Sequence, residues 1–322
     1  MDPATEFGLL TALLYGVSDF VAKFSSRAVG VWRTLFWGEL CSASLLTLWI
    51  ALDASGNGAA RAAFAQPWPV WAVAIASNMT ILAATAVFYR ALTIGRFSVV
   101  MPIVATYGAI TALLSMLLGE PLGLVAVGGI AIAVLGAAFA SVPAPASVSG
   151  PASSPPGPVA AGRGVGLASL AALLYGIGFC VQARYAVPRL GHLIPVWLYY
   201  VLGCALLGSV GRIMRRDLSP PRLAQLPVVL GTGLAASGAF VALTLAVTGG
   251  DVAVPTVLAS LASVVTVLLA RLLIKEQVAP HQWAGIAAVV FGLLMLHASP
   301  LHAPAAGIAA AGSAQTTGHT AG

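Results

Sequence analysis

Apolar stretches of about 20 residues, separated by short polar segments, run along almost the whole chain. A helix needs about 20 mostly apolar residues to cross the hydrocarbon core of a bilayer. The pattern therefore predicts an all-α membrane protein with ten transmembrane helices. The predicted spans cover residues 7–24, 33–52, 69–90, 97–119, 121–141, 164–186, 193–214, 225–247, 252–274 and 281–298.

A segment of different composition divides these spans into two sets of five. Residues 142–163 are rich in Pro, Ser, Ala and Gly, which is typical of a flexible linker. The first set lies within residues 1–141 and the second within residues 164–299. Residues 300–322 are rich in Ala, Gly, Ser and Thr, and we expect them to form a disordered tail. Because five is odd, the second set must enter the membrane from the side opposite to the first.

The two halves also repeat each other in sequence. The letters ALLYG occur at residues 12–16 and again at 172–176. Glu120 is followed after nine and sixteen residues by glycines, and Glu276 repeats this spacing. Duplicated bundles of opposite topology are typical of secondary transporters, whose substrate site lies at the repeat interface. We therefore predict two inverted five-helix repeats around a central cavity. Its walls are expected from spans 7–24, 69–90, 97–119, 164–186, 225–247 and 252–274, with spans 121–141 and 281–298 packed outside.

The composition argues against several other classes of protein. Hydrophobic residues make up 59% of the chain and charged residues 7%, whereas a soluble domain carries about 25% charged residues. The net charge of +6 comes from single basic residues at span ends, so there is no basic stripe for nucleic acid. No metal-spaced pair, phosphate loop or nucleophile elbow occurs, so we expect no metal, no cofactor and no enzyme activity.

The basic residues are distributed unevenly between the two sides of the predicted bundle. Twelve Lys and Arg residues flank the loops after the first, third, fifth, seventh and ninth spans. The other three, Arg61, Arg184 and Arg189, flank the opposite side. Loops with many positive charges stay in the cytoplasm. This distribution predicts that both termini are periplasmic.

These features together resemble the drug/metabolite transporter superfamily, in its ten-helix EamA-type exporter branch. The resemblance rests on the duplicated ALLYG, on Pro102 and Pro255 early in matching spans, and on LLGEPL at 117–122 against LIKEQV at 273–278. It covers roughly residues 8–298. It implies export across a bacterial inner membrane, and within the branch the chain is most like amino-acid exporters, including the aromatic ones. Many relatives are described with cytoplasmic termini, whereas the basic residues of this chain predict periplasmic ones.

Two acidic residues lie well inside predicted spans, where charged groups are costly and mark functional sites. Asp19 and Glu39 are therefore candidates for carrying a proton or for binding a substrate amino group. In the alternative interpretation, Asp19 pairs with Lys23 one turn later and has a structural role. Glu120 and Glu276 precede the fifth and tenth spans, and we expect the dipoles of those helices to stabilise them.

Polar residues also form a stripe in span 69–90. Trp71, Asn78 and Thr85 recur every seven residues, with Tyr89 one turn further on, so they share a helical face. The amide of Asn78 offers two donors and an acceptor, which suits a zwitterion, and Thr85 adds a hydroxyl. These two residues are candidate substrate ligands. The alternative is that Asn78 makes an interhelical hydrogen bond.

Aromatic residues supply the remaining candidates for substrate binding. Tyr15 and Tyr175 occupy the same place in the two repeats and are expected to face each other across the pseudo-two-fold axis. An aromatic lining fits an amphipathic ligand. The alternative is the aromatic belt at the membrane interface, which Trp32, Trp68 and Tyr200 fit better because they lie near span ends. The other candidates are Tyr107, Tyr199 and, two turns beyond Tyr175, Gln182.

The combined evidence predicts a secondary transporter that exports small amphipathic metabolites, above all aromatic or other neutral amino acids, by alternating access. The expected partners are a small-molecule substrate and the lipid bilayer, with no nucleic acid; the oligomeric state stays open, with a monomer as one option. One alternative function is a multidrug or vitamin carrier of the same fold. Another, of a different class, is a membrane-embedded enzyme or receptor.

Overall fold

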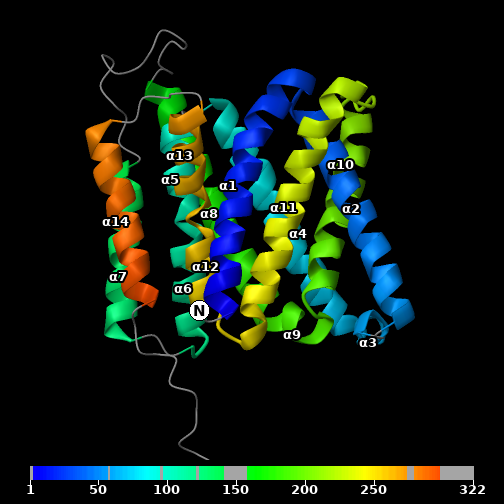
Figure 1. The fold of residues 1–322 in the computed structure, drawn as a ribbon, viewed down its shortest axis with the longest axis horizontal. Helices are drawn as coiled ribbons and strands as arrows, with labels where there is room; N and C mark the ends of the chain where they lie inside the picture. Colours follow the sequence, from blue (N-terminus) through cyan, green and yellow to red (C-terminus); the bar gives the residue numbers. More distant parts are fainter. Residues whose placement is uncertain are drawn as a thin grey trace, which may run out of the picture.

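The computed structural model describes residues 3–56, 59–94, 97–120, 123–140, 158–273 and 279–297, and throughout these ranges the regular structure is helical (Figure 1). This confirms the all-α fold class. The α-helices are α1 (Pro3–Val29), α2 (Val31–Gly56), α3 (Ala59–Phe64), α4 (Trp68–Ile94), α5 (Phe97–Ala105), α6 (Tyr107–Leu117), α7 (Leu124–Ala140), α8 (Pro158–Val181), α9 (Val187–Leu190), α10 (Leu193–Ile213), α11 (Leu226–Ala246), α12 (Ala253–Ala259), α13 (Ala262–Leu273) and α14 (Pro280–His297).

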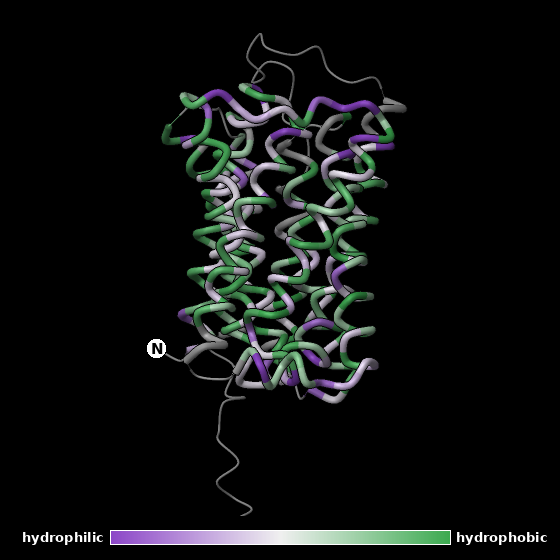
Figure 2. Tube along the Cα trace, turned by 90° about the vertical axis from the view of Figure 1, so that its right-hand side faces the viewer, coloured by the Kyte–Doolittle hydropathy of each residue, from purple (hydrophilic) through white to green (hydrophobic). Residues whose placement is uncertain are grey.

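Eight stretches of the described chain are long and apolar enough to cross a membrane. In Figure 2 the most hydrophilic residues gather at the two ends of the bundle, and the middle is mostly hydrophobic. The predicted fifth and tenth spans correspond to α7 and α14, whose apolar stretches are shorter, at residues 127–136 and 283–292. The eight stretches are Pro3–Val29, Val31–Leu52, Trp68–Ala91, Val100–Leu117, Gly162–Leu190, Leu193–Ile213, Leu223–Gly249 and Ala253–Leu273.

The expected linker and tail fall mainly on residues 141–157 and 298–322, which lie outside the described part of the chain. Residues 158–163 already belong to α8, so the sixth span begins earlier than the sequence pattern predicted. Large apolar side chains such as Leu48, Leu124 and Phe291 are exposed on the outside of the bundle. In a bilayer they contact lipid, which explains an apolar surface that would be unstable in water.

The duplicated ALLYG segments form close packing contacts between the two repeats. Gly16 of α1 packs against α13, where a Cβ atom on Gly16 would lie 2.5 Å from Val265 Cβ. Gly176 of α8 packs against α6, where a Cβ atom would lie 2.5 Å from Ile110 Cγ2. Helix α1 of the first repeat and α8 of the second therefore each pack, at a glycine, against a broken span of the other repeat. Only glycine permits such a close approach.

A matching pair of hydrogen bonds accompanies these two contacts. The Thr266 hydroxyl donates to the carbonyl of Gly16 at 3.2 Å, and the Thr111 hydroxyl donates to the carbonyl of Gly176 at the same distance. The same bond thus occurs twice, once in each direction between the repeats. It supports the inverted two-repeat architecture at the level of single atoms.

Helices α7 and α14 pack against each other at one side of the bundle, on the left of Figure 1. Gly136 lies so close to α14 that a Cβ atom would sit 2.8 Å from the Gly285 carbonyl oxygen, and Gly292 lies even closer to the Gly129 carbonyl oxygen. The small residues repeated in these spans therefore form a helix–helix contact. Their expected position outside the central cavity is confirmed for the described residues.

The fourth and ninth spans are both interrupted in their middle. The first breaks at Thr106, between α5 and α6, and the second at Ser260 and Leu261, between α12 and α13. The Thr106 hydroxyl donates to the Ile103 carbonyl at 2.7 Å, and the Ser260 hydroxyl donates to the Val257 carbonyl at 2.6 Å. Hydroxyl groups that bond back to the preceding turn bend helices, so both repeats place a flexible point at the same depth.

The two ends of the bundle are named here by the course of α1. The N-terminal face is the end at which α1 begins, where α3 and α9 also lie, and the opposite face is the end at which α1 ends (Figure 1).

Candidate functional site

A cavity lies between the two repeats, at the depth of the two helix breaks. The volume of the cavity is about 180 Å³, whereas one water molecule needs roughly 10–15 Å³. Helices α1, α2, α4, α5, α6, α8, α10, α11 and α13 contribute to its wall. The six predicted wall spans are therefore confirmed, but the prediction was incomplete, because the second and seventh spans (α2 and α10) also line the cavity.

Aromatic side chains dominate the wall. Of the seven tyrosines in the chain, the cavity is lined by six. Tyr175 and Phe179 stack with their ring planes 8° apart, and Phe240 meets both Phe179 and Tyr199 edge-on. These contacts fix the ring orientations, so the cavity has preformed aromatic faces. The six are Tyr15, Tyr89, Tyr107, Tyr175, Tyr199 and Tyr200.

A chain of hydroxyl groups crosses the wall from one repeat to the other. The Tyr175 hydroxyl donates to Thr85 Oγ1 at 2.9 Å, and Thr85 Oγ1 lies 3.1 Å from the Tyr199 hydroxyl. Thr85 belongs to α4 of the first repeat, whereas both tyrosines belong to the second. The chain brings three predicted site residues together in one polar element of the wall.

Two carboxyl groups, those of Asp19 on α1 and Glu39 on α2, also line the cavity. Glu39 is 7% exposed and its Oε2 atom has no hydrogen-bond partner. Its carboxyl group lies against Gly203 of α10, where any side chain would collide with it. The side chain of Lys23 lies outside what the structure describes, so its pairing with Asp19 stays a prediction. Among the described lining residues there is no Lys, Arg or His.

The cavity lies nearer the opposite face than the N-terminal face. In α1 the lining begins at Tyr15, which is 12 residues, or about 18 Å, beyond the start of the helix at Pro3. In α2, by contrast, Thr34 lines the cavity and is only three residues from the helix start at Val31, on the opposite face. In the N-terminal half of the bundle, a buried apolar cluster packs α2, α3, α4, α9 and α10 together. It consists of Ile50, Ala60, Ala63, Val70, Ala74, Ala186, Leu190, Ile194 and Leu198.

Asn78 and Gln182 do not line this cavity. Asn78 is fully buried, and its Nδ2 atom donates to the carbonyls of Ala74 and Pro195 at 3.0 and 3.1 Å. Gln182 Nε2 donates to Asn78 Oδ1 at 3.0 Å. The two amides are thus hydrogen-bonded to each other between α4, α10 and the π-helical turn Gln182–Ala186 that continues α8, which matches the interhelical alternative. The seven other predicted site residues, Tyr15, Asp19, Glu39, Thr85, Tyr107, Tyr175 and Tyr199, all lie on the wall.

Several wall residues did not emerge from the sequence. Tyr200 was expected at the membrane interface, but it is 4% exposed and lines the cavity beside Tyr199, with the two rings edge-to-face. Ser18 and Thr34 line it as well. Ser18 could have been predicted as a wall residue from the sequence, because it directly precedes Asp19. For Tyr200 the position near a span end was misleading, because its ring packs into the buried cluster that also contains Tyr199 and Phe240.

Glu120 joins the two repeats at the N-terminal face, outside the membrane-spanning segments. Its Oε1 atom accepts hydrogen bonds from the backbone N–H groups of Val252 and Ala253 at the start of α12. Glu120 therefore interacts with the N-terminus of a helix of the other repeat, which the sequence did not predict. Burial raises the pKa of this carboxyl, and the two N–H bonds oppose that rise. Glu276, its counterpart, lies outside the described residues.

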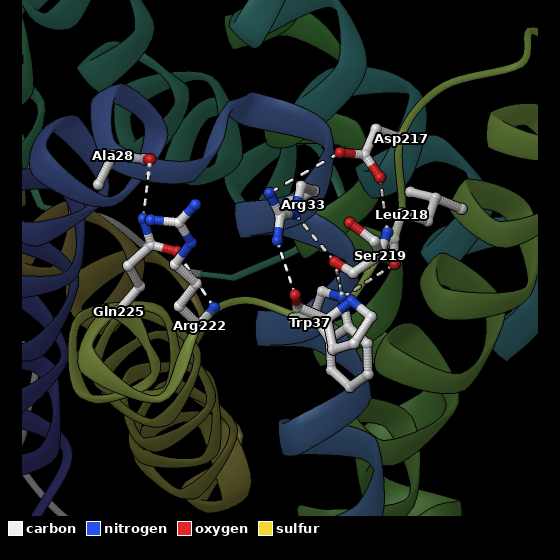
Figure 3. Close-up of polar contacts among 9 residues, drawn as sticks. Ala28, Arg33, Trp37, Asp217, Leu218, Ser219, Arg222 and Gln225 are labelled. Carbon is white, nitrogen blue, oxygen red and sulfur yellow. Dashed lines mark hydrogen bonds and ion pairs between the residues drawn. The ribbon is translucent and has the colours of Figure 1, made fainter.

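A polar contact joins the repeats at the opposite face (Figure 3). Arg33 donates to the carbonyls of Ser219 and Pro220 at 2.9 and 2.7 Å, and Trp37 Nε1 donates to the carbonyl of Leu218 at 3.1 Å. Asp217 lies 3.8 Å from Arg33. The loop between α10 and α11 is thereby held against the first turns of α2, beside the wall residue Thr34.

Within the described chain, no group of three His, Cys, Asp or Glu residues could hold a metal ion. The site thus consists of aromatic rings, hydroxyl groups and two carboxyl groups.

Comparison with known proteins gives the same architecture. Residues 5–142 and 162–298 each match the EamA-like transporter family, and the two matches coincide with the two repeats. A solved crystal structure superposes with a TM-score of 0.70 at 21% sequence identity, over 91% of this chain and 95% of the other, which shows a shared fold. No curated protein matches the chain.

Proposed function

This chain belongs to the EamA-like transporter family, and we propose that it exports small amphipathic metabolites, above all aromatic or other neutral amino acids, by alternating access. The observation that carries the proposal is the aromatic cavity between the two repeats, which combines fixed ring faces with hydroxyl and carboxyl groups. The apolar part of such a substrate would contact Phe179 and Phe240. Its ammonium group would face Asp19 and Glu39, and its carboxylate the hydroxyl chain at Thr85.

The position of the cavity supports alternating access. The N-terminal half of the bundle contains the apolar cluster and the Asn78–Gln182 pair, while the cavity lining reaches Thr34 in the first turn of α2 at the opposite face. The breaks at Thr106 and Ser260 give each repeat a point at which a span can bend. Rocking of one repeat against the other about these points would close one face and open the other.

The distribution of basic residues supports an orientation for this movement. In the sequence, twelve of the fifteen Lys and Arg residues flank the loops after the odd-numbered spans, and the first of these spans, α1, ends at the opposite face. We therefore assign that face to the cytoplasm and both termini to the periplasm of a bacterial inner membrane. The cavity then lies nearer the cytoplasmic side, from which an exporter takes its substrate. A C-terminal reporter fusion that is active only in the cytoplasm would contradict this orientation.

A multidrug or vitamin carrier is the alternative that the same cavity favours, because an aromatic wall also accepts larger amphipathic molecules. Uptake of labelled amino acids into proteoliposomes separates the two. We expect flux of a neutral aromatic amino acid and a loss of about tenfold in Thr85→Val, since the hydroxyl chain is broken. Thr80→Val on the same helix is the matched control, because Thr80 lies away from the cavity and bonds only to its own helix. Absence of flux for every amino acid in the panel would contradict the proposal.

Asp19 is proposed as the proton-coupling residue, since it lies near mid-membrane on the cavity wall. Asp19→Asn should then abolish pH-dependent net flux and preserve exchange between equal substrate pools. If Asp19 is a structural partner of Lys23 or a substrate ligand, both activities should fall together. Unchanged flux and unchanged pH dependence would remove Asp19 from the mechanism.

A further inference from the structure

Glu39 stands out among the wall residues because its carboxyl group is both buried and incompletely bonded. The side chain is 7% exposed, and Oε2 has no hydrogen-bond partner. An incompletely paired buried carboxylate is costly, and proteins normally compensate it with a cation or with hydrogen bonds. Oε2 itself lies against Gly203 of α10, but Glu39 lines the cavity, so a molecule bound there can meet the carboxyl group and compensate its charge.

The neighbouring helix holds this carboxyl group in place. Gly203 of α10 packs directly against the Glu39 carboxyl, with Cδ only 2.9 Å from the point where a Cβ atom would stand. One turn along α2, the Ser42 hydroxyl donates to the carbonyl of Gly233, which ties α2 to α11. Glu39 is therefore fixed between two helices of the second repeat and cannot leave the wall without moving them.

The groups around Glu39 are suited to an organic cation. Tyr199 and Tyr200 contribute edge-to-face rings with centroids 5.1 Å apart, and Phe240 lies 5.3 Å from Tyr199. An aromatic face attracts an ammonium group through its quadrupole, most strongly where water is excluded. A carboxylate beside such rings is a combination that binds amines.

The same wall offers little to an anion. The described lining residues include no Lys, Arg or His, and two of them are acids. A carboxylate or phosphate on the substrate would meet hydroxyl groups at best and would be repelled by Glu39 and Asp19. The exclusion of anions gives the site selectivity in addition to attraction.

We propose that Glu39 anchors the ammonium group of the substrate, so that the cavity selects organic amines with an aromatic or apolar body and does not require a carboxylate on them. This inference rests on the proposed function in taking the cavity as the substrate site. It goes further in predicting that a simple arylalkylamine binds better than the corresponding amino acid, alcohol or acid.

Calorimetric titration of the purified full-length protein in nanodiscs at pH 7 tests the inference with four probes of similar size. Phenethylamine is a cation, phenylalanine a zwitterion, 2-phenylethanol neutral and 3-phenylpropionate an anion. We expect phenethylamine to bind most tightly and 3-phenylpropionate most weakly. Glu39→Gln keeps the shape of the side chain and should weaken phenethylamine about tenfold, because a charge-assisted bond is lost, while 2-phenylethanol is unaffected.

Two further variants keep the result interpretable. Glu6→Gln removes an exposed acid in the first turn of α1 and should leave all four affinities unchanged. Gly203→Ala leaves the charge of Glu39 intact but displaces its carboxyl group, so it should weaken phenethylamine selectively. If Glu39→Gln fails to fold, Gly203→Ala still tests whether the position of the carboxyl group governs amine binding.

The inference is overturned if 3-phenylpropionate binds as tightly as phenethylamine, or if Glu39→Gln leaves the preference for phenethylamine over 2-phenylethanol unchanged. Its failure is distinct from failure of the exporter proposal. A protein that transports phenylalanine without preferring phenethylamine keeps the exporter proposal and loses the amine anchor. One that binds phenethylamine through Glu39 but moves none of the four solutes keeps the amine anchor and loses the exporter proposal.

Discussion

The two repeats are alike where they pack against each other and different where they face the cavity. Tyr15 and Gly16 recur as Tyr175 and Gly176, and both glycines accept the same inter-repeat hydrogen bond from a threonine. Three residues further on the likeness ends, because the first repeat has Asp19 where the second has Phe179.

The wall shows the same difference on a larger scale. Both cavity acids, Asp19 and Glu39, belong to the first repeat, whereas the aromatic lining residues are shared, with four from the first repeat and five from the second. Packing residues stay duplicated because each inverted repeat must fit the other at equivalent points. The cavity lies between the two repeats, and a small substrate bound there has no symmetry to match. One repeat can therefore supply both acids while the two repeats share the aromatic surface.

The largest effect should come from breaking the duplicated contacts. A Cβ atom on Gly16 or Gly176 would lie 2.5 Å from a side chain of the other repeat. We expect Gly16→Ala and Gly176→Ala each to lower the free energy of unfolding by about 1–3 kcal/mol through overpacking. Thermal unfolding of the purified protein in detergent measures both.

Gly166→Ala is the matched control, because Gly166 lies on α8 with no atom within 4 Å of its would-be Cβ. It should be neutral or slightly stabilising, since alanine is the better helix former. A large loss in only one of the two ALLYG variants would show that the repeats are not equivalent at this contact.

The next effect concerns a contact for which the duplicated sequence offers no counterpart. Gln182 stands in the second repeat where the first has Ala22. Asn78→Leu removes the hydrogen bonds to Gln182, Ala74 and Pro195. Because each such bond contributes only modestly inside a membrane, we expect the free energy of unfolding to fall by about 2 kcal/mol. Reduced thermal stability with unchanged substrate affinity supports a structural role, and the reverse result would return Asn78 to the binding site.

The general architecture could be predicted from the sequence because it depends on length, periodicity and duplication. Runs of apolar residues define helices whatever their neighbours are, and an odd number of spans per repeat dictates inversion. Asp19, Glu39 and Tyr107 were found because polar or aromatic groups deep inside an apolar span need a reason to be there.

The remaining features depend on tertiary contacts that no single helix reveals. Thr85 and Asn78 share one face of α4 and are seven residues apart, yet one lines the cavity and the other is covered by α8 and α10. Periodicity fixes the direction of a side chain, and the neighbouring helix at each depth decides what it meets. The same reason explains why Tyr200 lines the cavity and why Glu120 bonds to α12. The sequence pattern had placed Tyr200 at the membrane interface and Glu120 beside the span that follows it.

A smaller effect should follow from Glu120, whose bonds to Val252 and Ala253 cross between the repeats. Glu120→Ala leaves two backbone N–H groups unpaired and should cost about 1 kcal/mol. Burial raises the pKa of Glu120 in the folded protein, so the folded state takes up its proton at a higher pH than the unfolded state does. Wild-type stability should therefore fall as pH rises from the ordinary glutamate pKa through the raised one.

Glu120→Gln should remove that part of the pH dependence, because glutamine still accepts a hydrogen bond but does not titrate. Thermal unfolding between pH 4 and pH 8 compares the three proteins. A steeper pH profile in Glu120→Gln than in the wild type would contradict the assignment. If the repeats are equivalent here, Glu276→Gln should change the profile in the same direction.

The smallest effect is expected at the opposite face, where the repeats meet through exposed polar groups instead of the apolar cluster of the N-terminal face. Arg33→Gln loses the bonds to Ser219 and Pro220 and should cost less than about 1 kcal/mol, because water replaces the lost partners. Its main result should be faster hydrogen exchange in residues 214–222. Asp217→Asn removes the charge that faces Arg33 but keeps the Oδ1 acceptor for the Ser219 backbone N–H, so it should leave exchange in this loop nearly unchanged. A rocking carrier needs one inter-repeat contact that opens readily, and a polar contact between exposed groups opens at lower cost than buried apolar packing. Equal exchange protection at both faces in the wild type would contradict that difference and would place the moving contact elsewhere.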